Sequence, residues 1–386
     1  MRKNFVKIFL VAGLSFATLG TFTSCSSNDD SNNNGGGKAP VEVADTNLGG
    51  TNGISLKKGQ SLHLTADKSW KLSGPLLVGD GATLTIDAGT TITASGGTSS
   101  YLAVAQGGKI FINGTAQKPV IFTASEKKAW GGIVVCGKAS INTGASSTSE
   151  VGNLPYGGTN DADNSGVIKY VQIKHAGARF TSEKEFNGLS LFGVGNGTVI
   201  EGVSVIDGAD DGIEFFGGTV NVSKVVSINN EDDAIDWTDG WRGTLTDAYA
   251  RRDLNNIGNR GIEADNNKNN NDASPRSNPT LRNITLVGHA GTQDEKEGTN
   301  LFRVGTYATL DNVVVSGWAV GFTFKDKATI DYFSNGKHIT NVKFENVATK
   351  VNGIEESAIS ENEAATGAGA GTQLPDWAKG WSGYNQ

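Results

Sequence analysis

The chain has 386 residues, with 33 Lys plus Arg against 40 Asp plus Glu, and a net charge of −7. Such an acidic chain has no general attraction to nucleic acid or to an anionic membrane surface, so neither is an expected partner. Its 53 Gly are about twice the usual share, and it has only 7 Pro and 1 Met, a composition that favours many tight turns over long helices.

The N-terminus is typical of an export signal. Arg2, Lys3 and Lys7 form a basic region, and residues 8–22 form an apolar core. Thr23-Ser24-Cys25 resembles the lipobox of bacterial lipoproteins. We therefore expect residues 1–24 to be removed as a signal peptide and Cys25 to carry lipid, so that a lipid anchor alone would contact the membrane. The alternative is cleavage elsewhere and a chance cysteine.

Residues 25–45 are expected to form a flexible tether after the lipidated cysteine. The stretch 26–38 contains no apolar residue and is rich in Ser, Asn, Asp and Gly. Its Asp29-Asp30 pair resembles the acidic export signal of Bacteroidetes surface lipoproteins. That resemblance implies an outer membrane lipoprotein exposed at the cell surface, although residence on the periplasmic side stays open.

Short alternating strands that end in glycine or asparagine turns recur along residues 46–350. The segments 84–90 and 109–115 are clear examples, and similar segments return near 199–205, 220–227, 281–286 and 310–315. One repeat over most of a chain favours a single elongated solenoid over several domains. We predict an all-β fold, a single-stranded right-handed parallel β-helix. The remaining residues, 351–386, would form a cap or tail, with 355–366 as a helical or irregular cap.

A six-residue phrase marks three successive coils. Asp-Asp-Gly-Ile-Glu-Phe at 210–215 returns as Asp-Asp-Ala-Ile-Asp-Trp at 232–237, and more loosely as Asn-Arg-Gly-Ile-Glu-Ala at 259–264. Stacked coils would bring equivalent residues within about 4.8 Å of one another. Because strand side chains alternate, the isoleucines should point inward and the acidic residues outward. The phrase predicts an exposed ladder made of Glu214, Asp236 and Glu263.

From residue 76 to about 346 the chain resembles the pectin-lyase-like superfamily of parallel β-helices. The resemblance is carried best by the segments 81–90, 114–123 and 130–133. The segments 155–160 and 217–220 also resemble a group of Bacteroidetes surface lipoproteins. These resemblances imply the fold, but no specific reaction.

Two enzyme chemistries of that superfamily can be compared with the chain. Polygalacturonases carry acidic residues on successive coils, which Asp211, Asp232 and Asp233 match in register. However, Asn259-Arg260-Gly261 stands where that family has Gly-His-Gly, and 300–303 lacks its paired Arg and Lys. The match to that mechanism therefore fails.

The second chemistry is that of polysaccharide lyases, which use Ca²⁺ and a basic residue. Asp211, Asp233, Asp236 and Glu263 offer the hard oxygen atoms that Ca²⁺ prefers, and Arg260 is the candidate base. The alternative is that backbone geometry alone selects Asp and Gly at these turns. The candidate catalytic residues are Asp211, Asp232, Asp233 and Arg260.

Four arginines lie close in sequence to the ladder: Arg242, Arg251, Arg252 and Arg260. They either form a basic patch for a polyanion or pair with the carboxylates of the ladder, and we favour pairing. Beyond them, residues 265–279 form a polar insertion that is either a flap over the ladder or a tolerated surface loop, with a slight preference for the loop.

Aromatic residues beside the ladder suggest sugar binding. Trp237 should point inward by strand alternation, whereas Trp241 should be exposed and available to stack on a sugar ring. The candidate ligand-binding residues are Glu214, Asp236, Trp241 and Glu263. Cys136 lies in an apolar strand and is expected to be a buried thiol.

The sequence therefore predicts a monomeric, surface-anchored β-helix lipoprotein that binds a polysaccharide or surface glycan, or acts as an adhesin. The alternative is a polysaccharide lyase or glycoside hydrolase that acts on an acidic polysaccharide through the same ladder. The only cofactor expected is Ca²⁺.

Overall fold

A computed structural model describes residues 39–40, 46–179, 185–253, 259–289 and 300–385. The chain separates into two units, residues 1–37 and residues 38–386. The expected signal peptide 1–24, Cys25 and nearly all of the tether lie outside the described residues. Within the part of the chain that is described, no helix is both long and apolar enough to cross a membrane.

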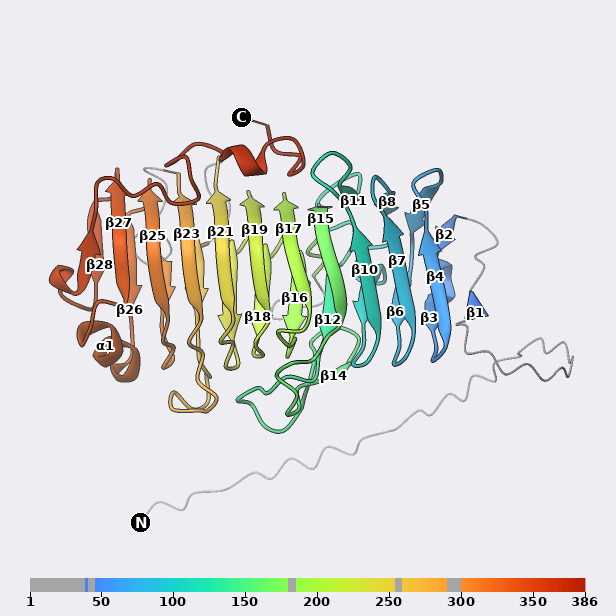
Figure 1. The fold of residues 1–386 in the computed structure, drawn as a ribbon, viewed down its shortest axis with the longest axis horizontal. Coiled ribbons are helices and arrows are strands. Elements are labelled where there is room, and N and C mark those ends of the chain that lie inside the picture. Colours follow the sequence, from blue (N-terminus) through green and yellow to red (C-terminus); the bar gives the residue numbers. More distant parts are fainter. Residues whose placement is uncertain (1–38, 41–45, 180–184, 254–258, 290–299, 386) are drawn as a thin grey trace, which may run out of the picture. The chain divides into compact units, whose positions relative to one another are not determined.

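The second unit is built from two sheets of parallel strands, between which the chain alternates once per coil (Figure 1). We call the sheet that carries the longer strands sheet A and the other sheet B. Each strand of sheet B between the two end strands pairs with the equivalent strand one coil earlier and one coil later. From first coil to last, sheet B consists of β3 (Ile54–Leu56), β6 (Pro75–Val78), β9 (Tyr101–Val104), β12 (Ile133–Cys136), β16 (Leu189–Phe192), β18 (Ile213–Phe216), β20 (Ile235–Thr238), β22 (Ile262–Ala264), β24 (Asn300–Phe302), β26 (Val320–Phe324) and β28 (Thr349–Asn352).

Sheet A follows the same order along the solenoid, with one branch in the first coils. Its main path is β1 (Ala39–Pro40), β4 (Gln60–Leu64), β7 (Thr83–Asp87), β10 (Lys109–Asn113), β15 (Gly166–Lys174), β17 (Val199–Ile206), β19 (Asn221–Ile228), β21 (Thr244–Arg251), β23 (Thr280–Val287), β25 (Thr309–Ser316), β27 (Ile339–Glu345) and β29 (Ile359–Glu361). The branch is β2 (Asn47–Leu48), β5 (Ser69–Leu72), β8 (Thr91–Ala94) and β11 (Val120–Thr123). An antiparallel pair, β13 (Ser147–Thr148) and β14 (Pro155–Tyr156), one α-helix, α1 (Lys327–Ser334), and the 3₁₀ turns Gly50–Asn52, Glu356–Ala358 and Asp376–Ala378 complete the described elements.

The interior of the coil is filled by stacked apolar side chains. Ile213 pairs with Ile235, and Ile235 pairs with Ile262, and all three are fully buried. Phe215 and Trp237 occupy the next inward position of β18 and β20. The predicted parallel β-helix and its inward isoleucine column are therefore confirmed, and the phrase that repeats in the sequence sets the register of sheet B.

The long strands of sheet A bend at one residue in the left-handed region. This residue is Lys224 in β19, Asp247 in β21, Asn283 in β23 and Asn312 in β25, with φ between 57° and 59°. Asn and Asp adopt this conformation at lower cost than other non-glycine residues. The Nδ2 atoms of Asn283 and Asn312 each donate to the side-chain oxygen one coil earlier, at 2.8 and 2.9 Å. These bonds tie the bend of each coil to that of its neighbour.

A long connection between β12 and β15 covers part of the outer face of sheet B. Ile141, Val151 and Tyr156 from this connection are buried against Cys136 and Phe192, which belong to β12 and β16. Cys136 is a free buried thiol, as the sequence predicts, and its burial raises the pKa of the thiol to about 12. Ala178 and Phe186, from the connection between β15 and β16, belong to the same cluster, so chain from two connections covers the apolar outward residues of these strands.

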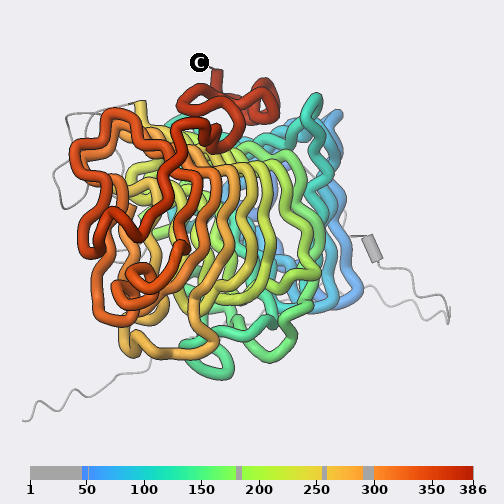
Figure 2. The backbone as a smooth tube through the Cα atoms, turned by 60° about the vertical axis from the view of Figure 1, so that its left-hand side comes forward, coloured from blue at the N-terminus to red at the C-terminus, as the bar shows by residue number. Residues whose placement is uncertain are grey.

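The C-terminal region differs from the cap expected at 355–366. This segment contains a 3₁₀ turn and the short strand β29, which pairs with β27. The tail then runs back along the outer face of sheet A, where Figure 2 shows it over the middle coils. Side chains of successive coils donate to backbone carbonyls of the tail: Gln172 to Trp381, Ser204 to Ser382, Thr285 to Gly371 and Tyr249 to Thr372.

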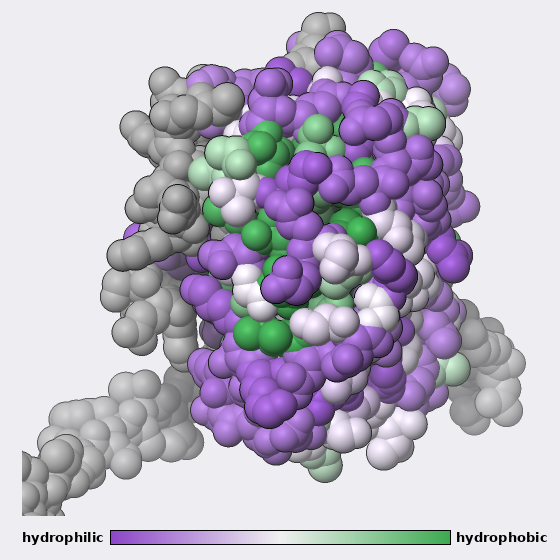
Figure 3. Space-filling model, turned by 90° about the vertical axis from the view of Figure 1, so that its left-hand side faces the viewer, coloured by the Kyte–Doolittle hydropathy of each residue, from purple (hydrophilic) through white to green (hydrophobic). Residues whose placement is uncertain are grey.

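At the C-terminal end, apolar side chains show through a polar surround (Figure 3). Ile330, Phe344, Val347 and Ile354 of the last coils are partly buried and pack against the core. The last coil is therefore covered less completely than the coils before it.

Candidate functional site

A cleft of about 520 Å³ lies on the outer face of sheet B. Its floor is formed by outward side chains of β16, β18, β20 and β22. One wall is the stretch 143–156, which includes β13 and β14 and which we call the hairpin loop. The other wall is the start of residues 265–279, which we call the asparagine loop. Its lining residues are Thr143, Ser147, Thr148, Glu150, Tyr156, Phe192, Glu214, Phe216, Asp236, Thr238, Asp239, Glu263, Asp265, Asn267, Lys268 and Asn269.

The predicted carboxylate ladder forms the middle of this floor. Glu214 pairs in register with Asp236, and Asp236 with Glu263, so the three acidic side chains lie one coil apart on the outward face. All three are partly buried rather than fully exposed. The expectation of an exposed ladder was therefore wrong in one respect, because the two loops enclose the ladder in a cleft.

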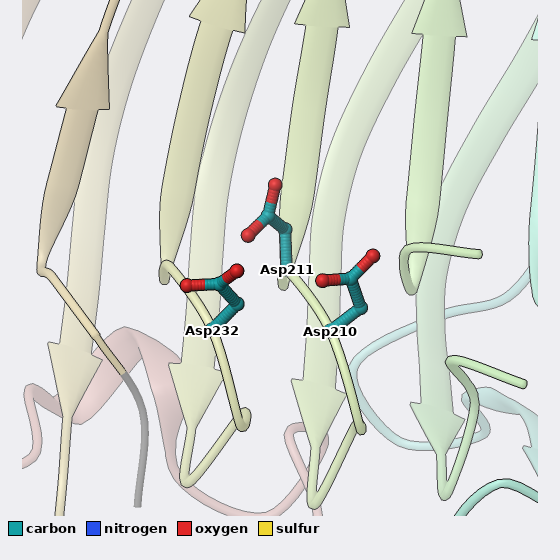
Figure 4. A group of neighbouring side chains, drawn as sticks. All are labelled: Asp210, Asp211 and Asp232. Carbon is teal, nitrogen blue, oxygen red and sulfur yellow. The ribbon is translucent and has the colours of Figure 1, made fainter. Parts of the chain in front are cut away.

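A second layer of acidic residues lies at the turns that lead into the same strands. Figure 4 shows Asp210 and Asp211 on the turn before β18, and Asp232 on the equivalent turn one coil later. Carboxylate oxygens of these three residues lie within 4.8 Å of one another. Asp211 is also structural, because its Oδ1 accepts a hydrogen bond of 2.8 Å from the backbone N–H of Asp233 in the next coil.

The two layers meet in two further groups of three. One group is Asp211, Glu214 and Asp236, and the other is Asp233, Asp236 and Glu263; within each group, one oxygen per residue lies within 4.8 Å of the others. The metal-ligand candidates Asp211, Asp233, Asp236 and Glu263 are thus brought together, although Asp211 and Asp233 do not line the cleft. Like charges at such spacing repel one another unless protons or cations compensate them.

Arginines compensate one end of this acidic region. Arg260 Nη1 lies 2.7 Å from Glu263 Oε1 and 3.9 Å from Asp233 Oδ1. Arg303 contacts Glu263 Oε2 at 2.6 Å and Asp265 Oδ1 at 2.9 Å. We call Asp233, Glu263 and Asp265 the arginine end.

Among the four arginines considered from sequence, Arg260 forms an ion pair with Glu263 of the ladder, and the charge of Arg252 opposes the rise that burial causes in the pKa of Asp233. Arg242 pairs with Asp161 at 2.7 Å, Arg251 pairs with Asp253 at 2.5 Å, and Arg252 stacks on Trp318. Sequence reasoning did not identify Arg303 as a partner, because it lies on a coil that lacks the repeated phrase. Arg303 directly follows β24, which pairs with β22, and this position one coil after Glu263 was the feature that could have identified it.

The other end makes no ion pair among the described residues, although the charge of Arg303 acts on Asp236 from further away. Asp211, Glu214 and Asp236, which we call the acidic end, make no ion pair within the described ranges, and Glu214 accepts a hydrogen bond from Asn187 Nδ2. Burial, and then the neighbouring carboxylates, raise the pKa of all three groups well above its ordinary value.

Glu263, Asp265 and Asp210 also have raised pKa values. Burial raises the pKa of Glu263 and of Asp265, but Arg303 acts in the opposite direction on both. Burial, with smaller contributions from Glu185 and Asp232, raises the pKa of Asp210 to about 8. A raised pKa favours the protonated form of a carboxyl group, whereas a bound cation would favour its charged form.

The expected exposure of Trp241 was wrong. The backbone turns back inward at Asp239 and Gly240, which have φ of 57° and 88°. Trp241 is therefore fully buried, stacked on Phe215 at 3.8 Å, and it donates from Nε1 to the carbonyl of Val220 at 3.1 Å. Trp241 belongs to the core and cannot stack on a ligand.

Other aromatic side chains border the cleft instead. Phe192 and Phe216 stack with ring centroids 4.0 Å apart, and Tyr156 packs on Phe192 at 5.0 Å. The Tyr156 hydroxyl donates to Asp239 Oδ2 at 3.0 Å. The sequence did not reveal them, because Tyr156 comes from the hairpin loop and the Phe residues stand outside the repeated phrase.

Two of the catalytic candidates lie elsewhere. Asp232 and Arg260 line a small cavity of about 10 Å³ at the turn, next to Trp318 and not in the cleft. A cavity of this volume holds about one water molecule. None of the four catalytic candidates lines the cleft, because they lie in the turns and behind its floor. They are Asp211, Asp232, Asp233 and Arg260.

The oxygen donors fit a hard divalent cation. Asp211, Glu214 and Asp236 each place one carboxylate oxygen within 4.8 Å of the other two, and none of the three makes an ion pair within the described residues. Ca²⁺ takes several oxygen ligands in flexible geometry, so the residues present suit it.

The asparagine loop is fixed to the opposite wall of the cleft. Asn142 Nδ2 donates to Asn266 Oδ1 at 2.8 Å, and Asn267 Nδ2 donates to Asn142 Oδ1 at 3.0 Å. Asn266 is fully buried. The loop therefore forms a wall beside the ladder. From the sequence we had considered a flap over the ladder and a tolerated surface loop, with a slight preference for the loop.

The family comparison agrees with this architecture. A family model described as a pectate-lyase-like β-helix domain matches residues 55–382. No curated protein and no solved structure matches the chain.

Proposed function

We propose that the acidic cleft binds a glycan, because the chain belongs to the pectate-lyase-like β-helix family, which supports a polysaccharide-related role. The single observation that carries this proposal is the cleft itself. It combines about 520 Å³ of volume with a row of hydrogen-bond acceptors on its floor and aromatic rings at its border. Small-ligand sites commonly have this size and this mixture of apolar and polar groups.

A divalent cation would complete the site at its acidic end. Asp211, Glu214 and Asp236 are the residues that would hold it, because Asp233 and Glu263 already interact with Arg260. Bound Ca²⁺ would offset the carboxylates and attract an anionic sugar, which an uncompensated acidic floor would repel. The proposed ligand class is therefore an acidic polysaccharide that is rich in uronate groups.

A glycoside hydrolase is the second candidate function. Glu214 and Asp236 have carboxylate oxygens within 4.8 Å of each other, which is near the spacing of about 5 to 5.5 Å between the carboxyl groups of retaining enzymes. A lyase reaction with Arg260 as base is less well supported, because Arg260 is buried, contacts Glu263 and lies outside the cleft.

We also propose the anchor and location expected from the sequence. Cys25 would be lipidated and would hold a monomeric protein at the outer membrane, with the β-helix at the cell surface. Replacement Cys25→Ala should then release the protein from the membrane fraction. Unchanged fractionation would contradict the anchor.

The test of glycan binding is an array of acidic and neutral glycans, probed with the purified protein in Ca²⁺ and in EGTA. We expect binding to uronate-containing glycans in Ca²⁺, with loss in EGTA and in Asp236→Asn. Asp272→Asn is the matched control, since the Asp272 side chain is 80% exposed and lies outside the ladder. Absence of binding by the wild-type protein in Ca²⁺ would contradict the proposal. Release of reducing ends from a bound glycan would favour the hydrolase.

A further inference from the structure

We infer that the cleft is blocked along the solenoid axis and takes the end of a glycan chain, not an internal stretch of it. The inference rests on the proposed glycan binding and specifies which part of the polymer fits. A groove for an internal stretch has to leave room at both ends, along the direction in which the coils stack. Here both directions are obstructed.

The hairpin loop obstructs the side toward the N-terminal coils. Its Tyr156 is 3% exposed and packs on Phe192, which is 2% exposed. On β12, the outward residues Val134 and Cys136 are fully buried in the same cluster. A chain that lies over the ladder and continues toward β12 would therefore meet packed protein at β16.

Chain from the later coils obstructs the opposite side. The outward position after Glu263 is Leu301 of β24, and this side chain is only 1% exposed. Arg303 reaches back from the same coil to Glu263 and Asp265. The row of outward carboxylates therefore ends at β22, and a polymer could not follow it to β24.

The third boundary is the contact between the two loops. Asn142 precedes the hairpin loop and Asn267 belongs to the asparagine loop, 125 positions away, yet their side chains bond to each other. The backbone N–H of Asn142 also donates to the carbonyl of Asp239 at 2.9 Å. These bonds join the two walls at the edge where β20 and β22 end.

The acidic floor thus lies in a recess that is bounded on three sides. A terminal sugar can enter it with the rest of its chain leading away from the sheet. An internal sugar has two neighbours in the polymer and would need two exits. The residues that make the recess, and not those of the floor, are therefore expected to set the preference for chain ends.

The test is isothermal titration of the protein in Ca²⁺ with trigalacturonate and with long-chain polygalacturonate. If chain ends bind, the Kd of the polymer should equal the Kd of the trimer when the polymer concentration is expressed as chain ends. When the same concentration is expressed as sugar residues, the Kd of the polymer should be larger by a factor of roughly the number of sugars in the chain. A polymer affinity that follows total sugar residues would overturn the inference while leaving glycan binding intact. No binding of either probe would overturn the proposed acidic ligand, and this inference with it.

Two variants sharpen the test. Replacing residues 144–153 by a short glycine linker opens the N-terminal side, and should increase polymer affinity per sugar residue while trimer affinity changes little. The double variant Asn142→Ala with Asn267→Ala removes the hydrogen bonds between the two walls but keeps the apolar cover of β12 and β16. It should also increase polymer affinity per sugar residue relative to trimer affinity. If both folded variants keep the wild-type ratio of polymer to trimer affinity, the inference fails.

Discussion

Glu263 of the arginine end and Glu214 and Asp236 of the acidic end lie on the same face of sheet B, yet the two ends differ in what compensates their charge. At the arginine end, Arg260 and Arg303 contact Glu263 directly. At the acidic end, Glu214 has an amide partner, Asn187, and no ion pair within the described residues. Equivalent positions of one repeat thus differ in what neutralises them. Arginines neutralise the arginine end, whereas the acidic end needs protons or a cation.

Removing an arginine should have the largest effect. Arg260→Met would leave the buried Asp233 without its nearest cation and Glu263 with Arg303 alone, and breaking a buried pair typically costs about 3 to 5 kcal/mol. Chemical denaturation at pH 7 measures this loss. The matched control is Lys327→Met, whose ion pair with Asp331 is largely exposed and should contribute little. If Arg260→Met and Lys327→Met lower the free energy of unfolding equally, the arginines do not stabilise the arginine end more than a surface ion pair would.

Neutralising the acidic end should have the opposite sign. Without divalent cations, Asp236→Asn removes one of several buried carboxylates that repel one another, so we expect a gain in the free energy of unfolding on the order of 1 to 3 kcal/mol at pH 7. Glu263→Gln, at the arginine end, should instead destabilise the protein, because Arg260 and Arg303 lose their partner. Destabilisation by both variants in EGTA would show that the acidic end is satisfied without a cation.

The fold was predictable to a greater extent than the site. The repeated phrase at 210–215 and 232–237 fixed the inward and outward residues, because strand alternation and coil stacking are local rules. The enclosure of the ladder was not predictable, since the hairpin loop reaches it from more than 50 positions away in sequence. The burial of Trp241 was missed because this residue lies beyond the end of β20, where a turn at Asp239 carries the chain back to the core.

The pH dependence separates protons from cations as compensating charges. In EGTA, the folded pKa of Asp210, about 8, lies above its ordinary value of 3.8. The folded state therefore binds more protons in this interval, so stability should fall as pH rises from about 4 to 8, by up to about 1.4 kcal/mol per pH unit for each such group. Asp210→Asn should make this slope shallower. A slope that is unchanged in the variant would contradict the assignment.

The smallest expected effect lies at the border of the cleft. Tyr156→Phe removes the hydrogen bond to Asp239 but keeps the ring that packs on Phe192, so a loss of about 1 kcal/mol is expected. Thermal unfolding in EGTA measures it. A loss above about 3 kcal/mol would mean that Tyr156 supports the hairpin loop through more than this bond.

Calorimetry of the wild-type protein and Asp236→Asn, each in Ca²⁺ and in EGTA, tests the central claim most directly. If the acidic end holds a cation, Ca²⁺ at about 100 times its Kd should raise the Tm of the wild-type protein by about 4 °C, and this rise should be largely lost in Asp236→Asn. A wild-type Tm that is the same in Ca²⁺ and in EGTA would contradict the account.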